Sequence, residues 1–210
     1  MTPVQSFAPL GRHSGIVAVI DGDNIDTDQI VPRQFLGSTD RGTLKNAFLH
    51  EWRYDRNGAP LPAFVLNRPP YDEATILLVG RNFGCGSGRE HAAWALLAAG
   101  IRVIIGLSFN ATLVANAASN GVACVTILPE HHQRLAALAN NPATCRGEFD
   151  LAHERFRMGA LSIDVAIDAF QREALMHGQS ATDIAISRGA SVGDYERARK
   201  TQFPWLPIHG

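Results

Sequence analysis

A glycine-rich segment in the middle of the chain offers the most specific chemistry. Residues 84–91 read GCGSGREH and follow an apolar run, TILLVG, at 75–80. Glycines let a loop turn sharply and approach a ligand closely, and a helix that begins after the loop directs free N–H groups and partial positive charge towards it. The guanidinium of Arg89 adds a planar set of donors that suits a carboxylate. The segment therefore predicts an anion site.

The common phosphate-binding and nucleophile motifs do not fit this loop. A dinucleotide loop needs a third glycine where Arg89 stands, and an acidic residue about 20 positions further on, where residues 104–110 read IIGLSFN. A Walker A loop needs Gly-Lys-Ser/Thr, which is absent from the segment, and the G-x-S-x-G elbow has Cys85 at its first glycine. What remains is a small polycarboxylate held beside a serine.

Ser87 has two interpretations that the motif alone does not separate. Its hydroxyl lies among glycine amides before a helix, where the local field favours a developing alkoxide, so it can act as a base. It can equally be the N-cap of the following helix. The catalytic interpretation fails if Ser87 is buried away from any cavity, Arg89 is held in an internal ion pair and the surface beside them is closed. We expect Cys85 to fill a tight loop, because no base is fixed near it in the sequence.

The elements that must position this loop alternate along the chain. Apolar runs predict strands at 16–20, 75–80, 101–107 and 122–128, and helical spacing predicts helices at 43–53, 89–100, 108–121 (with Ser108 as N-cap) and 129–140. Alternation of this kind predicts a parallel α/β core with right-handed crossovers.

The pattern changes after residue 141. A β-hairpin or more strands are expected over 148–166, a short helix over 168–177, and two helical stretches within 181–200 that break at Gly189 and Gly193. We expect the last forty or so residues to wrap the core or to reach a partner.

Composition limits the class of protein. A length of 210 residues indicates one domain, or one domain with an appendage. The net charge of −1 argues against nonspecific nucleic-acid binding, and no run approaches the roughly 18 apolar residues of a membrane span. The three cysteines form no C-x-x-C pair, which argues against a zinc ribbon, an iron–sulfur site within this chain or a disulfide framework. With no recognisable signal peptide, these features predict a cytoplasmic protein.

Three segments, in order, resemble the small subunit of 3-isopropylmalate dehydratase, in the aconitase superfamily. RNFGCGSGREHAAWAL (81–96) is similar to the signature N-F-G-x-G-S-S-R-E-H-A of the swivel domain. NIDTDQIVPRQFL (24–36) is similar to N-x-D-T-D-x-I-I-P-x-x-F-L. DVAIDAFQREALMHG (164–178), with TDIAIS (182–187), is similar to the C-terminal pattern of that subunit. The resemblance covers roughly residues 16–190.

The resemblance implies an α/β fold: a three-layer β/β/α swivelling domain, like the aconitase C-terminal domain, over residues 1–165. A C-terminal helical extension over 166–210 would pack on the domain or on a partner. It implies a hydro-lyase that isomerises 2- and 3-isopropylmalate by dehydration and rehydration in leucine biosynthesis. Activity would require a large subunit that carries a [4Fe–4S] cluster, with no cofactor in this chain. Two alternatives stay open: the same chemistry on another malate-like acid (citraconate/methylmalate, homoaconitate or dimethylmaleate), and a noncatalytic carboxylate-binding module.

The same resemblance assigns roles to individual residues. Ser87 aligns with the base that removes a proton from the carbon next to a carboxylate. Arg89 aligns with the arginine that binds a substrate carboxylate, and Asp28 aligns with an aspartate that orients the site.

Other positions complete the expected substrate contacts. Gly86 and Gly88 belong to the substrate-binding loop, and Gly88 departs from the family, which has a second serine there. The missing hydroxyl removes a hydrogen bond that is typically worth about 0.5–1.5 kcal/mol, which bears on the identity of the substrate more than on the type of reaction. Arg33 and Arg41 are candidates for a second carboxylate contact.

Overall fold

The fold is built on one mixed β-sheet. The computed structural model describes residues 6–187, 189–203 and 205. Within them, seven strands form a sheet of order β4-β3-β2-β1-β5-β6-β7. The strands are β1 (Arg12–Ile20), β2 (Ala74–Val79), β3 (Val103–Gly106), β4 (Ala123–Thr126), β5 (Arg146–Asp150), β6 (Arg155–Met158) and β7 (Leu161–Asp164).

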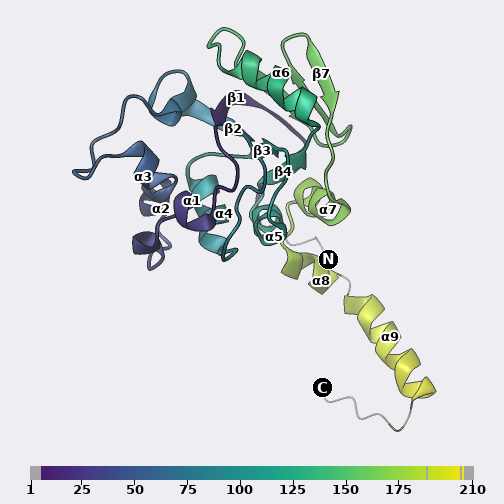
Figure 1. The fold of residues 1–210 in the computed structure, drawn as a ribbon. Coiled ribbons are helices and arrows are strands. Elements are labelled where there is room, and N and C mark those ends of the chain that lie inside the picture. Colours follow the sequence, from purple (N-terminus) through teal and green to yellow (C-terminus); the bar gives the residue numbers. More distant parts are fainter. Residues whose placement is uncertain (1–5, 188, 204, 206–210) are drawn as a thin grey trace.

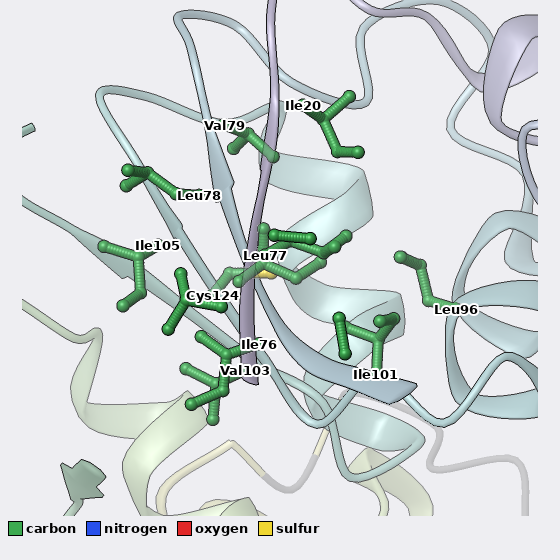
Figure 2. Packing of buried hydrophobic residues seen from close by; sticks show 14 of the residues in the cluster. Ile20, Ile76, Leu77, Leu78, Val79, Leu96, Ile101, Val103, Ile105 and Cys124 are labelled. Atoms are coloured by element: carbon green, nitrogen blue, oxygen red, sulfur yellow. The ribbon is translucent and has the colours of Figure 1, made fainter. Parts of the chain in front are cut away.

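The two halves of the sheet differ in strand direction. Strands β1 to β4 are parallel, and β5 joins the other edge of β1 in an antiparallel ladder that continues through β6 and β7. The parallel strands are continuous apolar runs because both of their faces are covered. Figure 2 shows Ile76, Leu77, Leu78 and Val79 of β2 packed among the apolar residues of its neighbours. In β7, buried Leu161 and Ile163 alternate with exposed residues.

The sheet curls until its two ends meet. Thr126, at the end of β4, and Ala166, just after β7, exchange a pair of backbone hydrogen bonds of 2.9 Å each. The parallel and antiparallel halves thus act as two β layers, and helices supply the third. This arrangement confirms the expected α/β fold class.

Helices α4 (Glu90–Ala98) and α5 (Ala111–Ser119) follow successive parallel strands of one direction, so right-handed crossovers place them on one face. Figure 1 shows them below the strands, while α6 (Pro129–Ala139) lies above. The remaining helices before β2 are α1 (Thr27–Ile30), α2 (Arg41–Ala47), α3 (His50–Arg53) and three short 3-10 turns, Arg33–Phe35, Val65–Asn67 and Tyr71–Glu73. None of the described helices is long and apolar enough to cross a membrane.

The single helix expected over 43–53 is wrong, because the chain forms α2 and α3 instead. Leu49 breaks it with a left-handed backbone, φ +50°. Its side chain is fully buried, and its N–H donates to the carbonyl oxygen of Ile30 at 2.9 Å. A tertiary contact therefore overrides the helical spacing.

The C-terminal helices are α7 (Ala169–His177), α8 (Ala181–Ser187) and α9 (Gly189–Gln202). Helix α7 ends at Gly178, as predicted, and its buried Gln171 holds β4 through bonds to the N–H and the carbonyl of Cys124, at 2.6 and 3.0 Å. The break expected at Gly193 is wrong, since α9 runs through it; one helical glycine costs only about 1 kcal/mol relative to alanine. Figure 1 shows α9 extending away from the sheet. Much of the terminal FPWLPIHG segment lies outside the described residues.

Candidate active site

Two loops leave the carboxyl ends of β1 and β2 and lie side by side. The parallel pairing of these strands continues into the loops: Gly84 N–H donates to the carbonyl of Ile25 at 2.7 Å, and Thr27 N–H donates to the carbonyl of Cys85 at 2.9 Å. In open α/β sheets, the crevice beyond the carboxyl ends of the strands is where ligands bind. The two motifs that are far apart in the sequence therefore form one surface.

A third loop supports the glycine loop from its other side. Phe83 N–H donates to the carbonyl of Ser108 at 3.1 Å, and Asn82 N–H donates to the Ser108 hydroxyl at 2.8 Å. Ser108 is therefore a loop support and not the N-cap that the sequence predicted. Helix α5 begins later, where the side chain of Asn110 accepts from the N–H groups of Thr112 and Leu113.

The hydroxyl of Ser87 is exposed and has one described partner. Its Oγ lies 3.2 Å from Oγ1 of Thr27, whose residue is only 2% exposed. The N-cap of α4 is Arg89, which makes no side-chain capping bond. The structure therefore does not support the N-cap interpretation of Ser87. Sequence reasoning missed Thr27 as a contact of Ser87, although it lies in the motif directly before Asp28.

Asp28 joins two guanidinium groups. It pairs with Arg89 through Oδ1 and accepts from Arg33 Nε at 3.0 Å through Oδ2. Burial by itself would raise the pKa of Asp28. The hydrogen bond from Arg33 and the positive charges of Arg89 and Arg33 outweigh that effect and hold the pKa below its usual value. Asp28 is therefore ionised at neutral pH, and the triad keeps one net positive charge that can attract an anion.

The surface beside Asp28 and Arg33 is open. A cavity of about 380 Å³ is lined by Asp28 and Arg33 together with Asp26 and Glu51, and neither Ser87 nor Arg89 is among its described lining residues. Arg89 is held in an ion pair, but Ser87 is exposed, so the condition under which the catalytic interpretation fails is not met. Arg41 does not join this hydrogen-bonded group within the described chain. It begins α2 and lines a different cavity, with Trp94.

An iron–sulfur cluster does not fit the described residues. Among them, no group of three or more His, Cys, Asp or Glu side chains is placed to hold a metal ion. Cys85 donates to the carbonyl of Asn24 at 3.3 Å and so links the two loops. Cys124 and Cys145 are buried, and burial raises the pKa of Cys124 to about 12.

Glycine is required at several points of the loop. Gly84, Gly86 and Gly88 all have positive φ, at +75°, +94° and +62°. A Cβ on Gly84 would lie 2.1 Å from Leu113 Cδ2, and one on Gly88 would lie 2.6 Å from Thr112 Cγ2. The glycine that replaces the family's second serine therefore lets the loop pass close to α5.

We expect Gly88→Ser to destabilise the chain by about 2–4 kcal/mol, because a left-handed non-glycine residue and an overpacked contact each cost about 1–3 kcal/mol. Thermal unfolding measures this as a melting temperature lower by roughly 5–15 °C. Gly37→Ser is the matched control, since a Cβ at Gly37 meets nothing within 4 Å. Adding Thr112→Ala to Gly88→Ser should recover part of the loss. Equal melting temperatures for Gly88→Ser and Gly37→Ser would contradict this geometry.

Comparison with known proteins agrees with the fold. The family model of the aconitase C-terminal domain matches residues 8–130. A crystal structure of 3-isopropylmalate dehydratase from Methanocaldococcus jannaschii superposes with a TM-score of 0.64. It covers 87% of this chain and 99% of that chain at 23% identity, which supports the fold alone.

Curated relatives extend the match over almost the whole chain. The 3-isopropylmalate dehydratase small subunit of Roseiflexus sp. (strain RS-1) is 37% identical, over 91% of this chain and 94% of the relative. The protein of the same name from Cereibacter sphaeroides (strain KD131) is also 37% identical, over 97% of this chain and 100% of the relative. The chain therefore belongs to the family of 3-isopropylmalate dehydratase small subunits, which lies within the aconitase C-terminal domain family.

Proposed function

We propose that the chain is the small subunit of a hydro-lyase that interconverts 2- and 3-isopropylmalate by dehydration and rehydration, in leucine biosynthesis. The names of the relatives support this substrate. The observation that carries the chemistry is the exposed residue Ser87, whose hydroxyl is hydrogen-bonded to buried Thr27. Thr27 directly precedes Asp28 in the sequence, and Ser87 is two positions before Arg89, so both belong to the loops that form the cationic triad of Asp28, Arg33 and Arg89.

In this proposal, Ser87 acts as the base. As an alkoxide, its Oγ accepts the proton from the carbon next to a carboxylate, and the electron pair of that C–H bond forms the alkene. The substrate hydroxyl leaves as hydroxide with the C–O electron pair, and the cluster assigned to the large subunit would accept it as a Lewis acid. In rehydration, Ser87 returns the proton. Thr27 Oγ1 lies 3.2 Å from the Ser87 oxygen, and when Ser87 is deprotonated only the Thr27 hydroxyl can donate in this pair, which favours the deprotonated form.

The cationic triad binds the substrate. Arg89 presents its guanidinium to one carboxylate, and Asp28 fixes its orientation. Two other arginines were expected as the contact for a second substrate carboxylate. We assign this contact to Arg33, which is hydrogen-bonded to Asp28. The same contact for Arg41 stays a prediction. The backbone of Gly86 and Gly88 lets the substrate approach closely.

A large subunit is part of the proposal. We assign the [4Fe–4S] cluster to that partner, and this chain contributes the base and the carboxylate contacts. We also propose that the chain divides near residue 165, with the helical extension over 166–210 packing on the domain or the partner, and that the pair works in the cytoplasm.

Thr27→Val is expected to lower kcat of the reconstituted complex about 10-fold and leave KM nearly unchanged. Valine keeps the volume but removes one hydrogen bond to the base, worth about 0.5–1.5 kcal/mol, and more if the base is charged. The acidic limb of the kcat–pH profile should also shift upwards, since the deprotonated form loses a donor. Thr27→Ser keeps the hydroxyl and should recover most of the activity. An unchanged kcat–pH profile for Thr27→Val would show that Thr27 does not stabilise the deprotonated form of Ser87.

The proposed function is tested by reconstituting the chain anaerobically with a cluster-bearing large subunit. The complex is then given each acid of a panel of malate-like acids, and the absorbance of the alkene measures turnover. We expect 2- and 3-isopropylmalate to be used with the highest kcat/KM. A clear preference for citraconate/methylmalate, homoaconitate or dimethylmaleate overturns the assigned substrate and retains the reaction. This comparison of substrates is necessary because Gly88 stands where the family has a serine, so the hydroxyl of that serine is missing from the loop. Carboxylate binding without turnover of any acid overturns the enzymatic proposal and favours a noncatalytic module.

A further inference from the structure

Two adjoining cavities lie at the far end of α4, away from the glycine loop. One, of about 350 Å³, is lined by residues that include Leu44, Trp94 and Leu97. The other, of about 520 Å³, reaches Arg102 and the N-terminal segment at Ser6. Both are lined by Arg41, Leu97 and Asn120, so together they form one groove, which we call the α4–α5 groove.

This groove is separate from the proposed active site. Arg89 is the N-cap of α4, whereas Leu97 lies in its last turn. With a rise of 1.5 Å per residue, the two positions are about 12 Å apart along the helix. None of the lining residues bonds to Asp28 or Ser87 in the described part of the chain.

The groove has an unusual charge balance. Arg41 and Arg102 both line it, and none of its described lining residues is acidic. Arg102 donates to the carbonyl of Ala8 at 3.1 Å through Nη2, while its Nε is buried and has no hydrogen-bond partner among the described residues. A buried donor without an acceptor costs about 1–3 kcal/mol, so a small shift of the Arg102 side chain that lets an anionic oxygen reach its Nε would offset that cost.

No ion pair holds Arg102 among the described residues. The ionised carboxylate of Asp183 accepts hydrogen bonds from the hydroxyls of two lining residues, Ser6 and Ser180, at 2.5 and 2.7 Å, so one negative charge lies beside the groove. The positive charge of Arg102 acts together with burial, which is the larger cause, to lower the pKa of His13. Two guanidinium groups, of Arg41 and Arg102, face this one carboxylate, and neither is held in an ion pair within the described chain, so they can bind an anion.

The other end of the groove is apolar. Leu44 is 3% exposed, and Trp94 and Leu97 are half-buried side chains on α4. Trp94 packs against His91, with ring centroids 4.6 Å apart. An apolar floor that leads to two guanidinium groups fits a molecule with a carboxylate at one end and a hydrocarbon at the other.

We propose that the α4–α5 groove binds a small monocarboxylic acid with an aliphatic or aromatic tail. Arg102 and Arg41 bind the carboxylate, and the tail packs against Trp94 and Leu97. This site uses neither Ser87 nor the Asp28 triad, and Arg41 is the one residue that it shares with the expected substrate contacts of the dehydratase.

The test uses the full chain and hexanoate as the probe. Titration calorimetry measures binding, and Trp94 fluorescence reports the position of the ligand in a Trp52→Phe/Trp205→Phe variant, which leaves Trp94 as the only one of the three tryptophans. We expect saturable binding of hexanoate at one site, with a change in Trp94 emission. Acetate lacks the tail and 1-hexanol lacks the charge, so each should bind at least 10-fold more weakly.

Variants locate the charge contact. Arg102→Gln should weaken hexanoate binding at least 10-fold, and Arg41→Gln, at an exposed position, repeats the test without a buried change. Arg134→Gln, an exposed position on α6, is the matched control and should bind as the unmodified chain does, as should Ser87→Ala. Any of four results would overturn the proposal. Hexanoate binding does not saturate, 1-hexanol or acetate binds as tightly as hexanoate, or both groove variants keep the affinity of the unmodified chain. The reconstituted dehydratase activity is measured separately, so its failure and the failure of this site are distinguishable.

Discussion

Replacing Ser87 with alanine is expected to lower kcat of the reconstituted complex by about 10²–10⁴-fold, the usual contribution of a positioned general base. KM should change little, because the carboxylate contacts belong to Arg89 and Arg33. The exposed position of Ser87 means that the change removes one hydroxyl without opening the core. Steady-state kinetics in both directions, by alkene absorbance, measures the effect.

The control for this prediction is Ser162→Ala, which removes an exposed serine hydroxyl on β7, outside both loops. It should keep full activity. Assembly with the large subunit is checked by gel filtration for both variants, so that a loss of kcat is not a loss of the complex. Full activity of Ser87→Ala in an assembled complex would rule out its assignment as the base.

Arg89→Gln is expected to lower kcat/KM by about 10²-fold or more, mostly through KM. Hydrogen bonds to charged groups are worth about 1.5–3 kcal/mol each, and a guanidinium offers two parallel ones to a carboxylate. Arg89→Lys keeps the charge but not the paired geometry, so it should recover only part of the loss. Initial-rate measurements over a range of substrate concentrations separate the two parameters.

The same variant has a readout that does not depend on catalysis. The charge of Arg89 is one cause of the lowered pKa of Asp28, so Arg89→Gln should raise that pKa towards its ordinary value, as measured by NMR titration of the carboxyl. Arg12→Gln is the matched control, because Arg12 also pairs with an aspartate, Asp150, but far from the loops. An Arg89→Gln enzyme with kcat/KM within twofold of the unmodified one would contradict the substrate-binding role.

The strands and helices of the parallel half were predictable because their signals are local. The apolar runs at 75–80 and 101–107 became the buried strands β2 and β3, and the glycine loop between β2 and α4 was found from its composition. The predictions failed where a tertiary contact decides the backbone, as at Leu49, which bonds to Ile30. They also failed at Gly193, where a weak helix-breaking tendency was taken as a boundary.

The site was predictable in its residues but not in its contacts. Ser87, Arg89 and Asp28 come from motifs, and the motifs carry no distance between segments that are about 60 positions apart in the chain. Only the pairing of the β1 and β2 loops brings Thr27 to Ser87. The cap at Asn110 was missed for a similar reason, since Ser108, two residues before it, is engaged with the glycine loop.

The seam between Thr126 and Ala166 has a consequence for how the chain can be divided. Strand β4 is the last strand of its half of the sheet, and this seam, together with Gln171 of α7, covers its outer side. An uncovered edge strand invites pairing with other molecules. A fragment that stops at residue 165 therefore loses the protection of that edge, and we expect it to aggregate even though every strand is still present.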